Sequence, residues 1–414
     1  MTENLRQLNR KIVGAFLVGL VFSTGVFFWD LGVSAIANAD EGVHALVTRE
    51  IRERPDWLTM HIRGETYFRK PPLAFWIRAV SQSVFGENEF ATRLPSALAG
   101  VATTVLLALW AWQWTRRWQT VAAVGVIFPL LPSTFVHTFR TGETDGTLIF
   151  LLTLTAYILW HSLRRPKLLA LAGLTTGLAL MTKSVAAGVV PIGFLLTLVV
   201  YRRWPYTWKQ ALLAAGVFFV IAAPWHVIEH VRHGSAFWNE YLGEHVVERV
   251  EERLHVTPKT HGPWWYLTAV ERGMYPWAWL IIPAALIEVQ RRKERADETG
   301  TFLIMWGFGT IVLFSLAATK LAWYVAPAFP ALSLLVAGFI ARPWRRMETS
   351  TAIATAAAAG GYAFVTQNEF QAGWSGWLSL SFVPALVVPG GVALIVLAAL
   401  ARVRRWSKVA TALI

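Results

Sequence analysis

Two adjacent carboxylates, Asp40 and Glu41, and a lysine, Lys70, are the residues whose types and spacing could do chemistry. The acids follow an apolar run, and the lysine precedes Pro71 and Pro72 in the segment GETYFRKPP. Proline suits the first turn of a helix, so Lys70 is expected at a helix start, where the dipole favours an anion. A lysine can hold a phosphate there while a carboxylate accepts the proton of an attacking hydroxyl. The pattern therefore favours a reaction of a phosphate that is linked to a lipid.

Each of these residues also has a purely structural interpretation. Asp40 suits the N-cap of a surface helix, and Glu41 suits its first turn. Lys70 suits a membrane interface, where its stem lies along apolar groups and its ammonium reaches water. The residues alone leave both interpretations open.

The rest of the chain predicts helices that span a membrane. Of its 414 residues, 55% are hydrophobic and 15% are charged, and the mean hydropathy is +0.46. The apolar residues form runs of roughly the length that a helix needs to cross a bilayer, about 17 to 25 residues, although some are shorter. These runs cover approximately residues 12–30, 94–114, 119–137, 144–162, 168–182, 184–201, 210–228, 269–289, 301–318, 323–341, 350–367 and 379–402. The expected fold class is all-α and polytopic, with about twelve transmembrane helices.

Basic residues gather in the gaps on one side of this twelve-helix arrangement. The clusters are Arg6, Arg10 and Lys11; Arg116 and Arg117; Arg164, Arg165 and Lys167; Arg202, Arg203 and Lys209; Arg291, Arg292 and Lys293; Arg342, Arg345 and Arg346; and Arg402, Arg404 and Arg405. Such a bias marks the cytoplasmic side and predicts that both termini are cytoplasmic. It also explains the net charge of +13 without nucleic-acid binding. The chain has no cysteine, which excludes disulfides.

Two long polar segments, residues 31–93 and 229–268, fall on the opposite side of the membrane in this arrangement. Polar loops on one face of a helical bundle often carry function. The first contains Asp40 and Lys70, each at the start of an expected amphipathic helix. We expect a single membrane domain over residues 1–414, with no large C-terminal soluble domain.

Three histidines near the second long segment share one face of a helix. His226, His230 and His233 follow the spacing i, i+4 and i+7. This spacing suits a metal site, or simply the wet end of a transmembrane helix.

The first long loop resembles a known family. It is similar to the first extracytoplasmic loop of GT-C glycosyltransferases, and in particular of the protein O-mannosyltransferase and lipid A aminoarabinose transferase superfamily (glycosyltransferase family 39 and relatives). The matching positions are Asp40, Glu41, Trp57, Thr59, Gly64, Tyr67, Phe68, Lys70, Pro71, Pro72, Leu73, Trp76, Phe85, Gly86, Glu89, Arg93, Leu94 and Pro95. Shorter similarities follow in LMTKSVAAGVVP and KLAWYVAPAFPALSLL, so that the resemblance extends over about residues 38–340.

The resemblance implies a GT-C fold and the inverting transfer of a hexosyl or pentosyl group from a polyprenyl-phosphate donor. The acceptor would be a hydroxyl of lipid A, another glycan, a lipid or a protein. The reaction would take place on the periplasmic face of a bacterial inner membrane. Asp40 would be the base or orient the acceptor, Asp145 would be a second acid, and Lys70 would hold the donor phosphate. Further residues proposed for the substrate cavity are Glu41, Tyr67, Lys183, His245, Lys320 and Tyr324.

Two positions depart from the aminoarabinose branch of this family. An arginine that follows the catalytic acid by three residues there is Val43 here, and a glutamate before the KPP lysine is Arg69 here. That glutamate is implicated in metal binding together with a histidine that would correspond to His245. The resemblance therefore requires no cofactor and leaves a divalent metal open, while Arg69 argues against one at this position. Arg69 could instead supply phosphate-binding charge that is absent at Val43. Both departures argue against aminoarabinose as the sugar.

Two alternative functions remain open. Twelve helices with intramembrane charges would also suit a secondary transporter, although transporters usually show repeated halves and interrupted helices. An inactive GT-C relative that acts as a scaffold subunit is the other alternative. Asp40 and Lys70 argue against an inactive relative, whereas Val43 and Arg69 argue for it.

Overall fold

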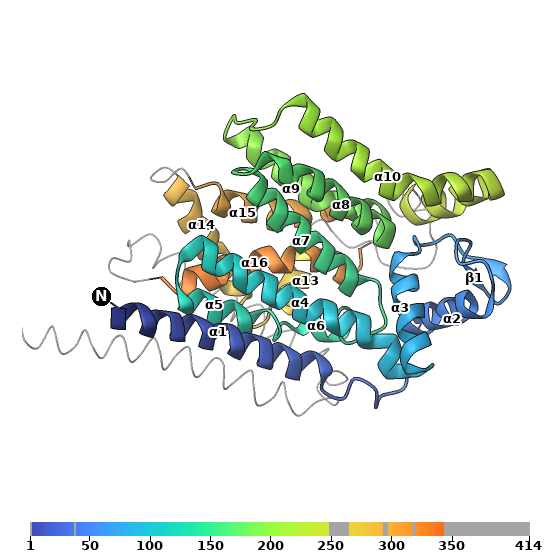
Figure 1. Cartoon of the computed structure of the whole chain (residues 1–414), viewed down its shortest axis with the longest axis horizontal. Helices are drawn as coiled ribbons and strands as arrows, with labels where there is room; N and C mark the ends of the chain where they lie inside the picture. The colour runs from blue at the N-terminus through green and yellow to red at the C-terminus, as the bar shows by residue number, and fades with distance from the viewer. Residues whose placement is uncertain (1, 37–38, 248–264, 293–296, 318–319, 343–414) are drawn as a thin grey trace, which may run out of the picture.

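The computed structural model describes residues 2–36, 39–247, 265–292, 297–317 and 320–342 (Figure 1). The chain is mostly helical, and its one short antiparallel hairpin in these ranges pairs His61 with Thr66. The elements are, in chain order, α1 (Thr2–Phe28), α2 (Ala39–Glu53), β1 (His61–Ile62), β2 (Glu65–Thr66), α3 (Leu73–Phe85), α4 (Glu89–Thr115), α5 (Trp118–Ile127), α6 (Pro132–Val136), α7 (Asp145–Ser162), η1 (Pro166–Leu168), α8 (Leu169–Lys183), η2 (Ser184–Gly188), α9 (Val189–Val200), α10 (Trp208–His233), α11 (Ser235–Trp238), η3 (Asn239–Val247), α13 (Trp265–Gly273), η4 (Ala278–Leu280), α14 (Ile281–Arg292), α15 (Thr299–Ser315), η5 (Ala322–Ala328) and α16 (Phe329–Ile340).

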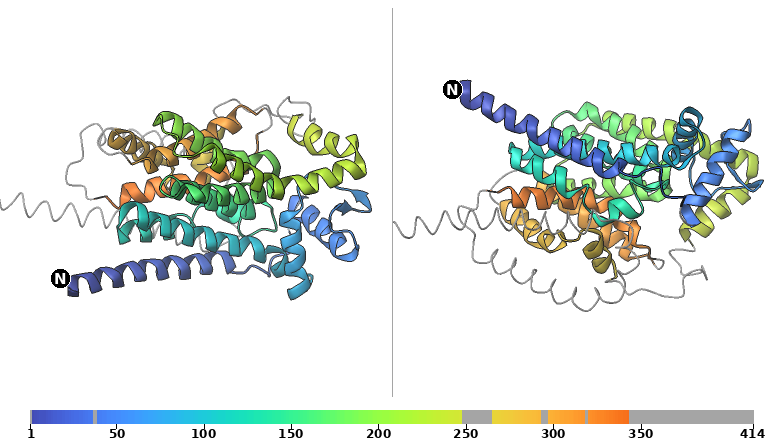
Figure 2. Two further views of the ribbon diagram at one scale, coloured as in Figure 1. Left: turned by 45° about the horizontal axis from the view of Figure 1, so that its top comes forward. Right: turned by 90° about the horizontal axis from the view of Figure 1, so that it is seen from below.

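The long helices run side by side in an elongated bundle, and the segment from α2 to α3 covers one end of it (Figures 1 and 2). The N-terminus of α1 lies at the opposite end. A buried core of aromatic and aliphatic side chains, centred on Trp110 and Trp306, holds the bundle together. A second core, which includes Val47 and Phe75, joins α2 and α3 to the start of the second long loop.

The surface of the bundle is apolar in the way that a lipid environment requires. Five helical segments of the described chain are long and apolar enough to cross a membrane. Apolar side chains point outward from two of them, α1 and α10. They include Val13, Leu17, Val18, Val21, Leu212, Leu213, Phe219, Val220 and Val231. Such a surface is unfavourable in water, and helices satisfy their own backbone hydrogen bonds in lipid. The expectation of an all-α polytopic membrane fold is confirmed.

The count of twelve spans stays a prediction. The expected run 119–137 is interrupted, since α5 ends at Ile127 and α6 begins at Pro132. The run 269–289 is divided among α13, η4 and α14, with Pro276 between the first two. Proline lacks the N–H that a helix interior needs, and its ring clashes with the preceding turn. The last two expected runs, 350–367 and 379–402, lie outside the described residues.

Both helices predicted for the first long loop form, but α3 begins at Leu73, so that Pro71 and Pro72 precede its first turn and Lys70 lies three residues before it. α2 begins at Ala39, so Asp40 and Glu41 occupy its first turn, and it ends at Glu53, ahead of Pro55. α3 ends at Phe85 because Gly86, with φ of 83°, turns the chain out of the helix. Both helices pack on each other, which places the loop that carries Lys70 against α2.

Several basic clusters lie at the other end of the bundle, where α4 meets α5 and α9 leaves for α10 (Figure 1). Arg117 donates to the carbonyl of Ala341, and Arg292 donates to the carbonyl of Val200, each at 3.1 Å. Cationic side chains suit these helix ends, where carbonyl groups lack partners within the helix. Several of the expected basic clusters thus lie opposite the α2–α3 end, which carries basic residues of its own, among them Arg49 and Arg52.

Helices α8 and α10 approach each other through glycines. Gly173 and Gly177 are spaced by four residues on α8. A Cβ added to Gly173 would lie 2.2 Å from the carbonyl oxygen of Ala214 on α10, and one added to Gly177 would lie 3.0 Å from the Cβ of Ile221. Small residues with this spacing let helix backbones pack closely in membranes. This contact positions α10, and with it the start of the second long loop.

We expect Gly173→Ala to destabilise the protein by about 1–3 kcal/mol, because the new methyl group meets backbone that must move. Thermal unfolding in detergent measures the loss. The matched control is Gly216→Ala on α10, where an added Cβ meets no atom within 4 Å. Equal melting temperatures for the two variants would contradict the close α8–α10 contact.

Candidate active site

Lys70 lies against a buried histidine of α2. Its Nζ is 2.8 Å from Nε2 of His44, which is only 1% exposed. Burial, followed by the charges on Lys70 and Arg78, lowers the pKa of His44 well below its usual value. The imidazole is therefore neutral and accepts a hydrogen bond from the Lys70 ammonium at Nε2, which assigns its proton to Nδ1. His44 thus holds one of the three ammonium donors and leaves two available.

Glu143 lies on the other side of His44, in the segment that leads into α7. Its Oε2 is 3.1 Å from Nδ1 of His44, although the two atoms lack the alignment of a hydrogen bond. The carboxylate is 3% exposed, and burial raises its pKa above the usual value. His44 therefore connects the cation of Lys70 to a buried acid that is more than seventy residues away in the chain.

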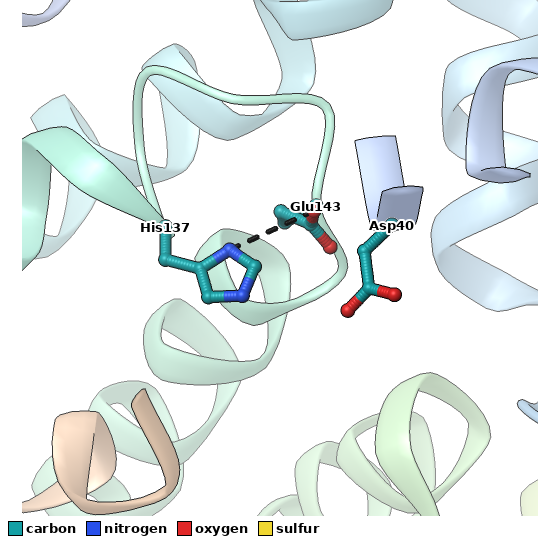
Figure 3. Close-up of side chains that lie close together, drawn as sticks. All are labelled: Asp40, His137 and Glu143. Atoms are coloured by element: carbon teal, nitrogen blue, oxygen red, sulfur yellow. Dashed lines mark ion pairs between the residues drawn. The ribbon is translucent and has the colours of Figure 1, made fainter. Parts of the chain in front are cut away.

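Asp40 and His137 complete a group around Glu143 (Figure 3). Nδ1 of His137 is 3.6 Å from Oε1 of Glu143, and one ligand atom from each of the three residues lies within 4.8 Å of the other two. Asp40 comes from the first turn of α2 and is exposed, whereas His137 directly follows α6. The edge of the His137 ring packs on Trp323, with ring centroids 3.8 Å apart.

A second acid–base pair lies at the same end of the bundle. Asp145 begins α7 and Lys183 ends α8, and Nζ of Lys183 donates to Oδ1 of Asp145 at 2.7 Å. The ammonium also lies 5.5 Å from the ring centroid of Tyr324 in η5. Because Lys183 and Asp145 neutralise each other, neither presents an unpaired charge.

The segment before α7 is held in place by a buried ion pair. Glu41 accepts from Nε and Nη2 of Arg93 at 2.8 and 3.1 Å, and its Oε1 also accepts from the backbone N–H of Gly142 at 2.7 Å. Arg78 donates to the carbonyl of the same glycine and to Oγ1 of Thr48. An added Cβ on Gly142 would lie 2.8 Å from Thr92, so this tight approach needs glycine. These contacts set where Glu143 and Asp145 lie relative to α2.

The structure brings together the three candidate residues Asp40, Lys70 and Asp145, and also Lys183 and Tyr324. The remaining candidates lie differently. Arg69 is exposed and pairs with Glu240 at 3.4 Å; Tyr67 is buried against Phe75, which raises its pKa; Lys320 donates to the carbonyl of Ala317; and Glu41 is engaged with Arg93. The side chain of His245 lies outside the described part of the structure.

Sequence reasoning overlooked His44, His137 and Glu143 as site residues. His44 follows Asp40 by four residues and so shares its face of α2, and Glu143 precedes Asp145 by two. These spacings are signals that could have indicated both. His137 carries no comparable local signal, since it reaches the site only through the turn after α6.

The three histidines of α10 do not converge on one point in the structure. His226 contacts the carbonyl of Ala222 and the hydroxyl of Tyr241, at 2.7 and 2.9 Å. His230 accepts from the indole N–H of Trp238, and His233 lies 3.5 Å from Glu229. Among the described side chains, the group of three potential metal ligands is instead Asp40, His137 and Glu143.

We expect Glu41→Gln to destabilise the protein by about 3 kcal/mol or more, because it leaves the buried Arg93 guanidinium without a countercharge. Chemical or thermal unfolding measures the change. Glu87→Gln is the matched control, since Glu87 pairs with Arg49 at the exposed surface, and such pairs contribute less than about 1 kcal/mol. A similar loss in both variants would show that the Glu41–Arg93 pair is not structural.

Comparisons with known proteins place this arrangement in a family. Residues 69–228 match the family described as dolichyl-phosphate-mannose-protein mannosyltransferase. The chain is 30% identical over 337 residues to the undecaprenyl phosphate-alpha-4-amino-4-deoxy-L-arabinose arabinosyl transferase of Pseudomonas aeruginosa (strain LESB58), covering 77% of this chain and 58% of that protein. It is also 30% identical over 346 residues to the protein of the same name from Edwardsiella ictaluri (strain 93-146), covering 80% and 60%. The chain thus spans less than two thirds of the length of these relatives.

Solved structures show the same fold. ArnT from Cupriavidus metallidurans bound to undecaprenyl phosphate matches with a TM-score of 0.73 and 21% identity, over 95% of this chain and 73% of that one. The apo state of the same protein matches with a TM-score of 0.70 and 23% identity, over 87% and 64%. In family match, sequence similarity and fold, the chain is similar to the GT-C glycosyltransferases that include the dolichyl-phosphate-mannose-protein mannosyltransferases and the ArnT-type arabinosyl transferases.

Proposed function

We propose that the protein is an inverting membrane glycosyltransferase that moves a sugar from a polyprenyl-phosphate donor to a hydroxyl acceptor. The observation that carries the proposal is the placement of Lys70 and Asp40 at one end of a membrane bundle, on either side of the His44–Glu143 contact. A donor with a long apolar tail reaches such a site from the bilayer, while its phosphate and sugar stay at the polar end.

Lys70 would hold the donor phosphate. His44 takes one N–H of its ammonium, which leaves two donors for phosphate oxygens. A half-buried cation stabilises the charge that develops on the phosphate oxygen as the bond to the sugar breaks. Lys183 is committed to Asp145, and Arg69 to Glu240, so Lys70 is the preferred phosphate ligand.

Asp40 would act as the base. The acceptor hydroxyl attacks the anomeric carbon from the face opposite the phosphate, its proton passes to the Asp40 carboxylate, and the electron pair of the broken C–O bond stays on the phosphate. Asp40 is exposed, and no Lys or Arg in the described part of the chain pairs with it, so its carboxylate is available to an acceptor. Asp145 would organise the site through Lys183 and Tyr324 rather than accept this proton.

The orientation and the substrates form part of the same proposal. The basic clusters at the far end of the bundle support a cytoplasmic N-terminus, and with it a position of α2 and α3 on the outer face of the bacterial inner membrane. The relatives' names support a pentose on undecaprenyl phosphate, whereas Val43 and Arg69 support a sugar other than aminoarabinose. The acceptor classes are lipid A, another glycan, a lipid or a protein. A panel of polyprenyl-phosphate sugars offered to the purified protein, with mass analysis of the products, tests all of these.

We expect Asp40→Asn to lower the rate of sugar transfer by about 100- to 10,000-fold, because it keeps the shape of the side chain and removes the base. The measurement is product formation in detergent or proteoliposomes, together with a melting curve. Asp56→Asn is the control, since Asp56 lies in the same loop but pairs with Arg232 at the surface. An Asp40→Asn protein with unaltered turnover would refute the proposed mechanism.

Lys70→Met should raise the KM for the donor by about 10- to 100-fold, because a hydrogen bond to a charged group contributes about 1.5–3 kcal/mol. Steady-state kinetics with varied donor concentration measure this. Lys167→Met, in η1 between α7 and α8, should leave the KM unchanged. A donor KM that does not respond to Lys70→Met would remove this lysine from the phosphate site.

A further inference from the structure

Asp40, from the first turn of α2, lies close to His137 and Glu143, which both belong to the segment between α6 and α7 (Figure 3). The 3.6 Å between Nδ1 of His137 and Oε1 of Glu143 is close to the separation of two ligands on one cation, which is about 3.4 Å when each bond is about 2.1 Å. A carboxylate oxygen of Asp40 lies within 4.8 Å of one ligand atom of each of the other two residues. We propose that these three residues form a binding site for a divalent transition-metal ion.

The burial of Glu143 supports a cation at this point. The side chain is 3% exposed, and its Oε2, which is 3.1 Å from Nδ1 of His44, makes no well-aligned hydrogen bond in the described part of the structure. A buried carboxylate is strongly disfavoured unless it is paired, hydrogen-bonded or bound to a metal. Asp40 adds a second carboxylate nearby, which increases the local negative charge.

The cationic side chains around the site are committed to other groups. Lys183 pairs with Asp145, Arg93 pairs with Glu41, and Arg78 donates to Gly142 and Thr48. Lys70 donates to His44. Within the described ranges, no lysine or arginine is within ion-pair distance of Glu143, whose charged neighbours are the two histidines. A metal ion would supply the missing countercharge.

The donor set indicates which metals fit. One imidazole nitrogen and two carboxylates suit Mn²⁺ or Zn²⁺, whereas Ca²⁺ and Mg²⁺ prefer oxygen ligands alone and Cu⁺ prefers sulfur. Three protein ligands leave at least one coordination position open, as in catalytic metal sites. The site differs from the one expected around position 69 and His245, since it shares no residue with it.

The open position lies next to the proposed phosphate site. A single imidazole, that of His44, separates Glu143 from Lys70. One phosphate oxygen of the donor could therefore bind the metal while a second phosphate oxygen binds Lys70. The metal would supply positive charge that the apolar side chain of Val43 cannot. This role rests on the proposed function, but the binding of the metal does not.

Titration of the purified full-length protein in detergent tests the site. After treatment with a chelator and its removal, we expect Mn²⁺ and Zn²⁺ to bind by calorimetry and to raise the melting temperature, since a ligand that binds only the folded state stabilises it. His137→Ala and Glu143→Gln should each weaken binding by at least about tenfold. His230→Ala is the matched control, because His230 lies on α10 and contacts Trp238 instead. It should bind both metals as the parent does.

Each outcome decides the proposal. A folded parent protein that binds neither metal would overturn it. Unaltered affinity in Glu143→Gln would also overturn it, even if His137→Ala fails to fold. Metal binding without sugar transfer would contradict the proposed function alone. Full transfer by a protein shown to be metal-free would exclude a catalytic role for the metal. The calorimetry would still decide whether the site binds it.

Discussion

The buried ion pair between Glu41 and Arg93 is the contact on which the arrangement of the site depends. It joins the first turn of α2 to α4, and through the N–H of Gly142 it also holds the segment that leads into α7. A carboxylate that accepts three charge-assisted or backbone hydrogen bonds in a dry environment allows little freedom to the groups around it. Asp40 precedes this anchor by one residue, and Glu143 follows Gly142 by one. The two adjacent acids therefore have different roles. Glu41 positions the segment before α7, whereas the side chain of Asp40 is exposed.

The polar side chains of the site form a connected network. Lys70, His44, Glu143 and His137 follow one another in contact, and Lys183 with Asp145 forms a parallel pair. Burial in a low-dielectric environment strengthens each interaction and penalises any group without a partner. His44 is the centre of this network because burial and its cationic neighbours keep it neutral. A neutral imidazole can accept from a lysine on one side while its N–H faces an acid on the other.

Several features followed from local patterns alone. The ends of α2 and α3, the basic clusters at the helix ends opposite them, and the apolar faces of α1 and α10 all depend on residues close together in the chain. The resemblance correctly indicated the superfamily, and with it the fold. The breaks after Ile127 and around Pro276 were missed because an apolar run predicts burial in lipid or protein but does not show whether the helix continues through its prolines.

The sequence by itself determined that the chain crosses a membrane and that Asp40 and Lys70 lie at or just before two helices of one loop, and it predicted a phosphate for the lysine. Only the tertiary structure decided which groups meet there. Glu143 and His137 lie about a hundred residues after Asp40 in the chain. The Glu41–Arg93 pair and the α2–α3 contacts set how close these residues come to Asp40 in space. Local periodicity specifies which face of a helix is polar, because it reflects the geometry of one helix. It does not specify which polar faces come together, because that depends on how helices distant in the chain pack.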